Sequence, residues 1–217
     1  MPNTSSQVGT ITGFRLDPFT PLTSFPAQPG AAYFFTNSEG TKYYSVARSG
    51  SDTLLVLDAA NPTNVLKRQN LAQAEAATLT PDGRRLLIVA NGLHIFDTAN
   101  DNLLNTVTNV GNQPIDVAVL PDASRAFVLS AASNTLTAVD LNTNTVAGTP
   151  LTFGGTLTGV AVGYNGFVYV TASNRLFEID GRNMTVRGEV QLNARPGKIA
   201  FTPDGFFGVL VNQTPVT

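Results

Sequence analysis

Short apolar runs separated by polar turns follow one another along the whole chain. One repeated feature is an acidic residue that closes an apolar run, at Asp17 (FRLD), Asp58 (LLVLD), Asp97 (LHIFD), Asp140 (LTAVD) and Asp180 (LFEID), with steps of 41, 39, 43 and 40 residues. A second is a turn sequence at Glu39, Asp82, Asp122, Asn165 and Asp204, with steps of 43, 40, 43 and 39 residues. Two independent features with one period indicate an internal repeat.

Each repeat is predicted to contain four short strands. In the repeat at 73–112 we expect strands at 76–80, 85–90, 93–97 and 103–107. The sequence Pro81–Asp82–Gly83 is suited to the first turn and Asn91–Gly92 to the second, because proline presets φ and glycine or asparagine accepts the left-handed conformation. The apolar run at 85–90 predicts a strand covered on both faces. The spacing of apolar residues indicates no helix.

Four strands per 40–45 residues in tandem are typical of a β-propeller. A four-stranded sheet has two apolar faces, and radial packing of such sheets covers both. An open β-solenoid is the alternative, but its repeats are usually shorter, about 20–30 residues. We therefore predict an all-β fold, a propeller of four-stranded antiparallel blades.

The two ends of the chain each supply half of a repeat. Residues 9–17 and 22–25 have the pattern of a third and a fourth strand, and residues 199–201 and 206–211 that of a first and a second. We predict a single domain over 1–217 with five blades, the fifth being a composite closing blade. The alternative is a fragment of a seven-bladed propeller, whose half-blades would pair between molecules. The predicted blades are 29–72, 73–112, 113–154, 155–196, and 1–28 with 197–217.

Two segments resemble a known group of repeat proteins. The segment FVYVTASN at 167–174, with the run at 176–180 after it, is similar to the YVTN-type β-propeller repeat. The segment ITGFRLDPFTPLTSFPAQP at 11–29 resembles lactonase-like propellers, which include 6-phosphogluconolactonase-type proteins. The resemblance implies a propeller fold and, as one alternative, lactone hydrolysis. Propellers of this group usually have seven blades, whereas this chain has repeats for five.

Composition excludes several classes of function. Of the 217 residues only 13% are charged, and the net charge is −2, so no basic surface for nucleic acid is predicted. The apolar run at 206–211 is far too short to span a membrane. There is no cysteine and a single histidine, so thiolate or histidine-rich metal sites are not expected, nor is any cofactor. The first ten residues have neither the basic nor the apolar segment of a signal peptide.

Charged residues at two places are candidates for ligand binding. When the repeats are aligned, Ala76, Asp116, Gly159 and Lys198 share one place at the start of the innermost strand. Asp116 and Lys198 put opposite charges there, either to hold a polar ligand or to pair with each other. Arg48, Glu75 and Arg195 belong to loops expected on one face, where arginine suits carboxylate or phosphate groups.

Other polar residues are expected to be structural. The repeated aspartates are spread around the repeats, so we interpret them as turn-forming residues rather than calcium ligands. His94 shares its repeat position with aromatic and aliphatic residues, which predicts a packed neutral imidazole. No nucleophile elbow, phosphate-binding loop or metal-ligand spacing occurs.

The residues favour a non-catalytic binding or interaction scaffold. It would bind a small polar ligand or a protein at the central channel face, through Asp116, Lys198, Arg48, Glu75 and Arg195. One alternative is a lactonase-like enzyme acting on a sugar-acid lactone; another is an engineered or fragment scaffold without a ligand. Low charge and Asn/Thr-rich loops favour an extracellular, periplasmic or cell-surface location. We expect a monomer or weak oligomer, with blade completion between molecules as one mode of association.

Overall fold

The structure is a computed structural model that describes residues 10–16, 18–49, 52–71, 74–202, 204 and 206–213. In these residues strands and turns alternate and no helix occurs, so none that could cross a membrane is present there. The chain divides into two compact units, Met1–Ala74 and Glu75–Thr217.

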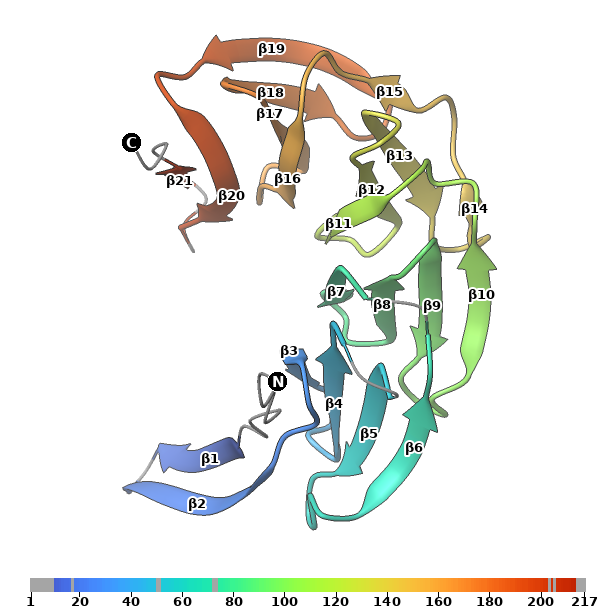
Figure 1. Ribbon diagram of the computed structural model, residues 1–217, viewed down its shortest axis with the longest axis vertical. Helices are drawn as coiled ribbons and strands as arrows, with labels where there is room; N and C mark the ends of the chain where they lie inside the picture. The colour runs from blue at the N-terminus through green and yellow to red at the C-terminus, as the bar shows by residue number, and fades with distance from the viewer. Residues whose placement is uncertain are drawn as a thin grey trace, which may run out of the picture. The chain divides into compact units, whose positions relative to one another are not determined.

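The first unit contains a hairpin and a four-stranded antiparallel sheet (Figure 1). The hairpin strands are β1 (Thr10–Leu16) and β2 (Phe19–Pro26). The sheet runs in the order β3 (Ala31–Thr36), β4 (Lys42–Ala47), β5 (Leu54–Asp58) and β6 (Val65–Gln69). Phe25 from the hairpin is buried with Leu55 and Leu57 of β5, so the two pieces share an apolar core.

The second unit repeats the same antiparallel order in three successive sheets and ends in a hairpin. The first sheet is β7 (Ala76–Leu79), β8 (Arg85–Val89), β9 (Leu93–Asp97) and β10 (Leu103–Val107). The second is β11 (Pro114–Val119), β12 (Arg125–Ser130), β13 (Thr135–Asp140), β14 (Thr145–Val146) and β15 (Leu151–Thr152). The third is β16 (Leu157–Val162), β17 (Phe167–Ala172), β18 (Arg175–Asp180) and β19 (Thr185–Gln191), followed by the hairpin β20 (Arg195–Phe201) and β21 (Gly208–Gln213).

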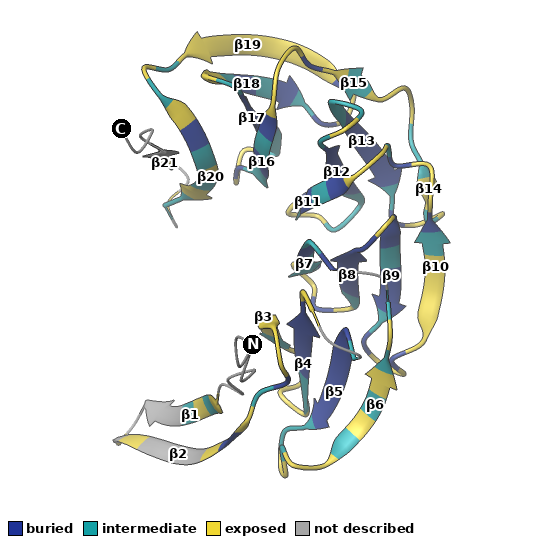
Figure 2. Cartoon of the chain, in the orientation of Figure 1, coloured by how far each residue is buried: buried dark blue, intermediate teal, exposed yellow. Residues whose placement is uncertain are grey.

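Neighbouring sheets of the second unit pack face to face. Figure 1 shows them fanned out, with β7, β11, β16 and β20 along one side, and these first strands contact one another in that order. The middle strands are buried, while β10 and β19 are largely exposed (Figure 2). Leu87 and Ile95 of one sheet share a core with Val128 and Val139 of the next. A sheet whose two faces are both covered needs continuous apolar runs, as these strands have.

Arginines at the start of second strands link neighbouring sheets. Arg85 on β8 donates to Asn144 Oδ1 in the adjacent sheet at 3.1 Å. Arg125 on β12 donates to the carbonyl oxygens of Gly181 and Arg182 at 3.0 and 2.6 Å. The planar guanidinium can satisfy several acceptors at once, so each arginine ties a turn of the next sheet to its own.

The sequence predictions of four-stranded antiparallel sheets are confirmed, with local corrections. The four expected strands of 73–112 correspond to β7–β10. The outer strand of 113–154 is split into β14 and β15, since Gly148 adopts a positive φ of 74° and Pro150 has no N–H to donate. The expected strand at 206–211 begins only at Gly208. The count of five blades, their union in a single domain and the composite closing blade stay predictions.

The repeated aspartates form the same turn in successive repeats. Asp58, Asp97, Asp140 and Asp180 each accept a hydrogen bond through Oδ1 from the backbone N–H two residues later, at 2.7–2.8 Å. At Asp180 this bond holds the pKa of the carboxyl below its ordinary value. The turn-forming interpretation is therefore confirmed for these four; Asp17 lies outside the described residues.

Candidate functional site

Asp116 and Lys198, which are 82 residues apart, meet in the second unit. Asp116 lies on β11 with its side chain 9% exposed, and Lys198 lies on β20 with its side chain 61% exposed. The Lys198 ammonium donates to Asp116 Oδ1 at 3.1 Å. The backbone N–H of Val160, on the intervening strand β16, donates to Asp116 Oδ2 at 3.3 Å. Both oxygens of the Asp116 carboxylate therefore accept a hydrogen bond, one from Lys198 and one from Val160.

The inner strands β11, β16 and β20 have the same irregularity in strand pairing near Asp116, Gly159 and Lys198. The pairing of β11 with β12 shifts between Pro114 and Asp116, and β16 and β20 carry corresponding shifts beside Gly159 and Lys198. Such irregularities change the direction of a side chain, which in a regular strand alternates between the two faces of the sheet. Gly159 stands between the two charged residues, and a Cβ there would lie 3.4 Å from the Lys198 Cα. The Lys198 backbone thus packs closely against β16 at Gly159.

Threonine hydroxyls hold the strands around the ion pair. Thr171 Oγ1, which is buried, lies 3.2 Å from the Gly159 carbonyl oxygen and 3.3 Å from that of Gly197. Thr158 donates to Thr171 Oγ1 at 2.8 Å. These contacts connect β16, β17 and β20, so the strand that carries Lys198 is fixed next to Asp116.

The other predicted residues belong to different elements of the two units. Arg48, in the first unit, donates to the Tyr33 hydroxyl at 2.8 Å, with its guanidinium carbon 5.5 Å from the centre of the Tyr33 ring. Glu75 opens the second unit, and its backbone N–H donates to the Val89 carbonyl. Arg195 is exposed at the start of β20. The predicted gathering of these three on one loop face stays a prediction.

His94 is held as a neutral ring by its surroundings. Its Nε2 lies 2.9 Å from the Ala90 carbonyl oxygen and its Nδ1 lies 3.1 Å from Thr106 Oγ1. In the neutral ring, Nε2–H donates to Ala90 and Nδ1 accepts from the Thr106 hydroxyl. Burial lowers the pKa of His94 below its ordinary value of 6.5, against the opposing effect of the Ala90 carbonyl. The imidazole therefore packs between strands as a neutral group.

This environment predicts a loss of stability in mild acid. Below the ordinary histidine pKa the unfolded chain binds a proton more readily than the folded one, so stability falls as pH drops from about 7.5 to about 5.5. The midpoint of urea unfolding should decrease over this range in the wild type. In His94→Leu, which removes the single histidine, the decrease should be clearly smaller. Parallel pH profiles of the two proteins would contradict the assignment.

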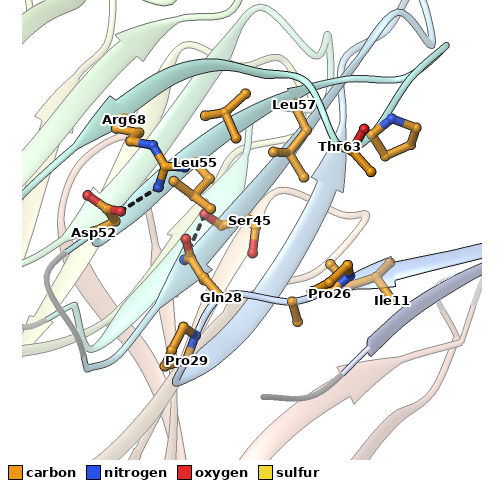
Figure 3. A pocket seen from close by; sticks show the side chains of 13 residues that line it. Ile11, Pro26, Gln28, Pro29, Ser45, Asp52, Leu55, Leu57, Thr63 and Arg68 are labelled. Atoms are coloured by element: carbon orange, nitrogen blue, oxygen red, sulfur yellow. Dashed lines mark hydrogen bonds and ion pairs between the residues drawn. The ribbon is translucent and has the colours of Figure 1, made fainter.

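A cavity of about 390 Å³ lies in the first unit, beside the hairpin β1–β2 and the sheet β3–β6 (Figure 3). Ile11, Pro26, Leu55, Leu57 and Val65 are among its apolar lining residues. The polar part of its lining includes Gln28 and Ser45, and the ion pair of Asp52 with Arg68.

Sequence reasoning missed this cavity. Gln28 follows β2 in a segment without a repeat feature, and Ser45 lies within a strand where a small polar residue gives no signal. The only pointer in the sequence is a glutamine between Ala27 and Pro29, which is too common a pattern to indicate a site.

Comparison with solved structures places the fold among known proteins. The chain superposes on Kuenenia stuttgartiensis hydrazine synthase with a TM-score of 0.73 and 18% identity, covering 87% of this chain and 57% of that one. It also superposes on a functionally unknown protein from Desulfotomaculum acetoxidans with a TM-score of 0.76 and 16% identity, covering 97% and 71%. The fold is a β-propeller. The chain spans little more than half the hydrazine synthase chain, and identities this low concern the fold alone.

No family model and no curated protein matches the sequence. Within the described ranges of the propeller, no group of three or more acidic or histidine side chains is placed to hold a metal ion.

Proposed function

We propose that this propeller is a non-catalytic binding module that holds a small, oxygen-rich polar ligand at Lys198, on the side of its innermost strands. The observation that carries the proposal is the contact of Lys198 with the buried carboxylate of Asp116. An ammonium group has three N–H donors, and Asp116 takes one. The others are available to ligand oxygens, because the side chain is largely exposed.

The anchoring by Asp116 also supports binding energetically. A free lysine side chain loses rotamer freedom when it binds a ligand, whereas one already held in place loses less. The Asp116 carboxylate and the Lys198 ammonium nearly neutralise each other, so recognition would rest on directed hydrogen bonds more than on net charge. A sugar acid, with several hydroxyl groups and one carboxylate, has suitable acceptors.

The contacts of Asp116 favour binding over catalysis. Opening a lactone requires a general base or an activated water, together with a group that stabilises the oxyanion. Asp116 is the acidic residue of this site, and both its oxygens already accept hydrogen bonds. A lactonase-like enzyme remains the alternative, as does a scaffold without a ligand. Membership of the YVTN-type repeat proteins, a protein partner and an extracellular, periplasmic or cell-surface location stay predictions.

Titration with D-gluconate tests the proposal. Binding to the full chain would be followed by isothermal calorimetry or by NMR, with glucitol as the comparator that lacks the carboxylate. Lys198→Met keeps the length of the side chain but removes its donors, and should weaken gluconate binding about three- to tenfold, a discounted value for a hydrogen bond from an exposed charged group. Lys67→Met, on the outer strand β6, is the matched control and should bind as the wild type does.

Two results would count against this function. If Lys198→Met bound gluconate as tightly as the wild type, Lys198 would not be the recognition group. If the wild type bound neither gluconate nor glucitol, the inner-strand ion pair would serve packing alone.

A further inference from the structure

We propose that the cavity of the first unit is a second binding site, for an uncharged and largely apolar small molecule that carries one N–H or O–H donor. Its volume of about 390 Å³ lies within the usual range of small-molecule sites, about 300–1,000 Å³. Leu55 and Leu57 of β5 face Ile11 and Pro26 of the hairpin across it (Figure 3). A mainly apolar wall favours an apolar ligand, because binding removes apolar surface from water.

Two buried polar atoms at the cavity have no partner. Gln28 is 8% exposed and Ser45 1% exposed. The amide nitrogen of Gln28 donates to the carbonyl oxygens of Ser45 and Thr53, at 3.1 and 3.3 Å. This fixes the orientation of the amide, and Gln28 Oε1 and Ser45 Oγ are left without a hydrogen bond. Unpaired buried polar atoms cost free energy, and most such atoms in folded proteins have partners.

The chemistry of these atoms indicates what the ligand must carry. An amide oxygen accepts hydrogen bonds and cannot donate, so Gln28 Oε1 requires an N–H or O–H group. Both oxygens are covered in this structure, so a hydrogen bond from a ligand to Gln28 Oε1 requires the side chains around it to rotate. The Ser45 hydroxyl can turn to donate or accept, and it adapts to the bound molecule.

The charges at the cavity argue for an uncharged ligand. Asp52 and Arg68 are the charged residues of the lining, and they bind each other, with Arg68 Nη1 2.6 Å from Asp52 Oδ2. The lining therefore has no net charge to compensate a buried ionic group, whose desolvation is costly. This site lies wholly in the first unit, and its existence does not depend on ligand binding at Lys198.

A pair of nearly isosteric probes tests the proposal on the full chain. Indole has an N–H donor where benzofuran has an oxygen, and their sizes are almost equal. Measured by calorimetry or ligand-observed NMR, indole should bind about five- to tenfold more tightly than benzofuran, the difference made by one hydrogen bond. Gln28→Met, which removes the acceptor but keeps the volume, should reduce this preference to about twofold or less.

A second variant tests the place of binding without altering Gln28. Val65→Phe inserts a ring into the cavity and should abolish the binding of both probes. Leu103→Phe, at the corresponding place on β10 and outside the cavity, should bind indole as the wild type does. Lys198→Met should also bind indole normally, which separates this site from the one on β20.

The proposal would be overturned by any of three results. Wild-type protein that binds no indole would show that the cavity takes no such ligand. Equal affinities for indole and benzofuran would show that the donor is not recognised. Unchanged indole binding in Val65→Phe would place the site elsewhere.

Discussion

Phe127→Ala should lower the free energy of unfolding by about 3–5 kcal/mol, the usual cost of removing a large aromatic side chain from a core. Phe127 lies on β12, is fully buried, and packs in the cluster that joins the sheets β11–β15 and β16–β19. Its ring is in contact with the turn at Gly181 of the next sheet. Because the surrounding strands are fixed on both faces, they cannot collapse to fill the cavity that the substitution would leave.

Urea unfolding followed by far-ultraviolet circular dichroism would measure this loss. Leu104→Ala in the same unit is the control, since Leu104 is 45% exposed on β10 and should cost less than about 1 kcal/mol. A loss of stability at Phe127 no larger than the loss at Leu104 would mean that the two sheets are not held together through this ring. Domains typically have only about 5–15 kcal/mol of stability, so Phe127→Ala should remove a large share of it.

Gly181→Ala should destabilise the protein by about 1–3 kcal/mol, because it overpacks the same contact from the other side. A Cβ at Gly181 would lie 2.6 Å from Phe127 Cζ and 2.9 Å from Val168 Cγ2. The turn cannot move away easily, since Arg125 donates to the Gly181 carbonyl oxygen. Thermal and urea unfolding would both report the change.

Two further variants separate steric crowding from an effect on the backbone. Gly188→Ala, on β19 where nothing lies within 4 Å of the added Cβ, should be neutral within about 0.5 kcal/mol. Combining Gly181→Ala with Phe127→Leu should cost less than the sum of the two single changes, because the shorter side chain makes room for the methyl group. Strictly additive costs would show that the two residues do not interact.

The two proposed sites differ in how much of each could be predicted. The period of the repeat aligns Asp116 with Lys198, so it was predictable that both lie at the start of an innermost strand. The sequence left two interpretations open, a ligand-binding pair or two charges that pair with each other. Their contact also depends on the packing of β20 against β16, which brings the Lys198 backbone beside Gly159. The cavity beside Gln28 was not predictable, because its lining comes from the hairpin β1–β2 and from three strands of another sheet.

Local chemistry in the sequence was sufficient for the strands, the turns and the repeat. The turn-forming hydrogen bonds reach only two residues along the chain, at Asp58, Asp97, Asp140 and Asp180. Short apolar runs separated by polar turns form strands where a neighbouring sheet covers them. Contacts between sheets were decided by the tertiary structure alone. Whether Gly181 lies against Phe127, or Gln28 Oε1 remains without a partner, depends on packing between segments far apart in sequence, and that packing is set by the shape of all the side chains together.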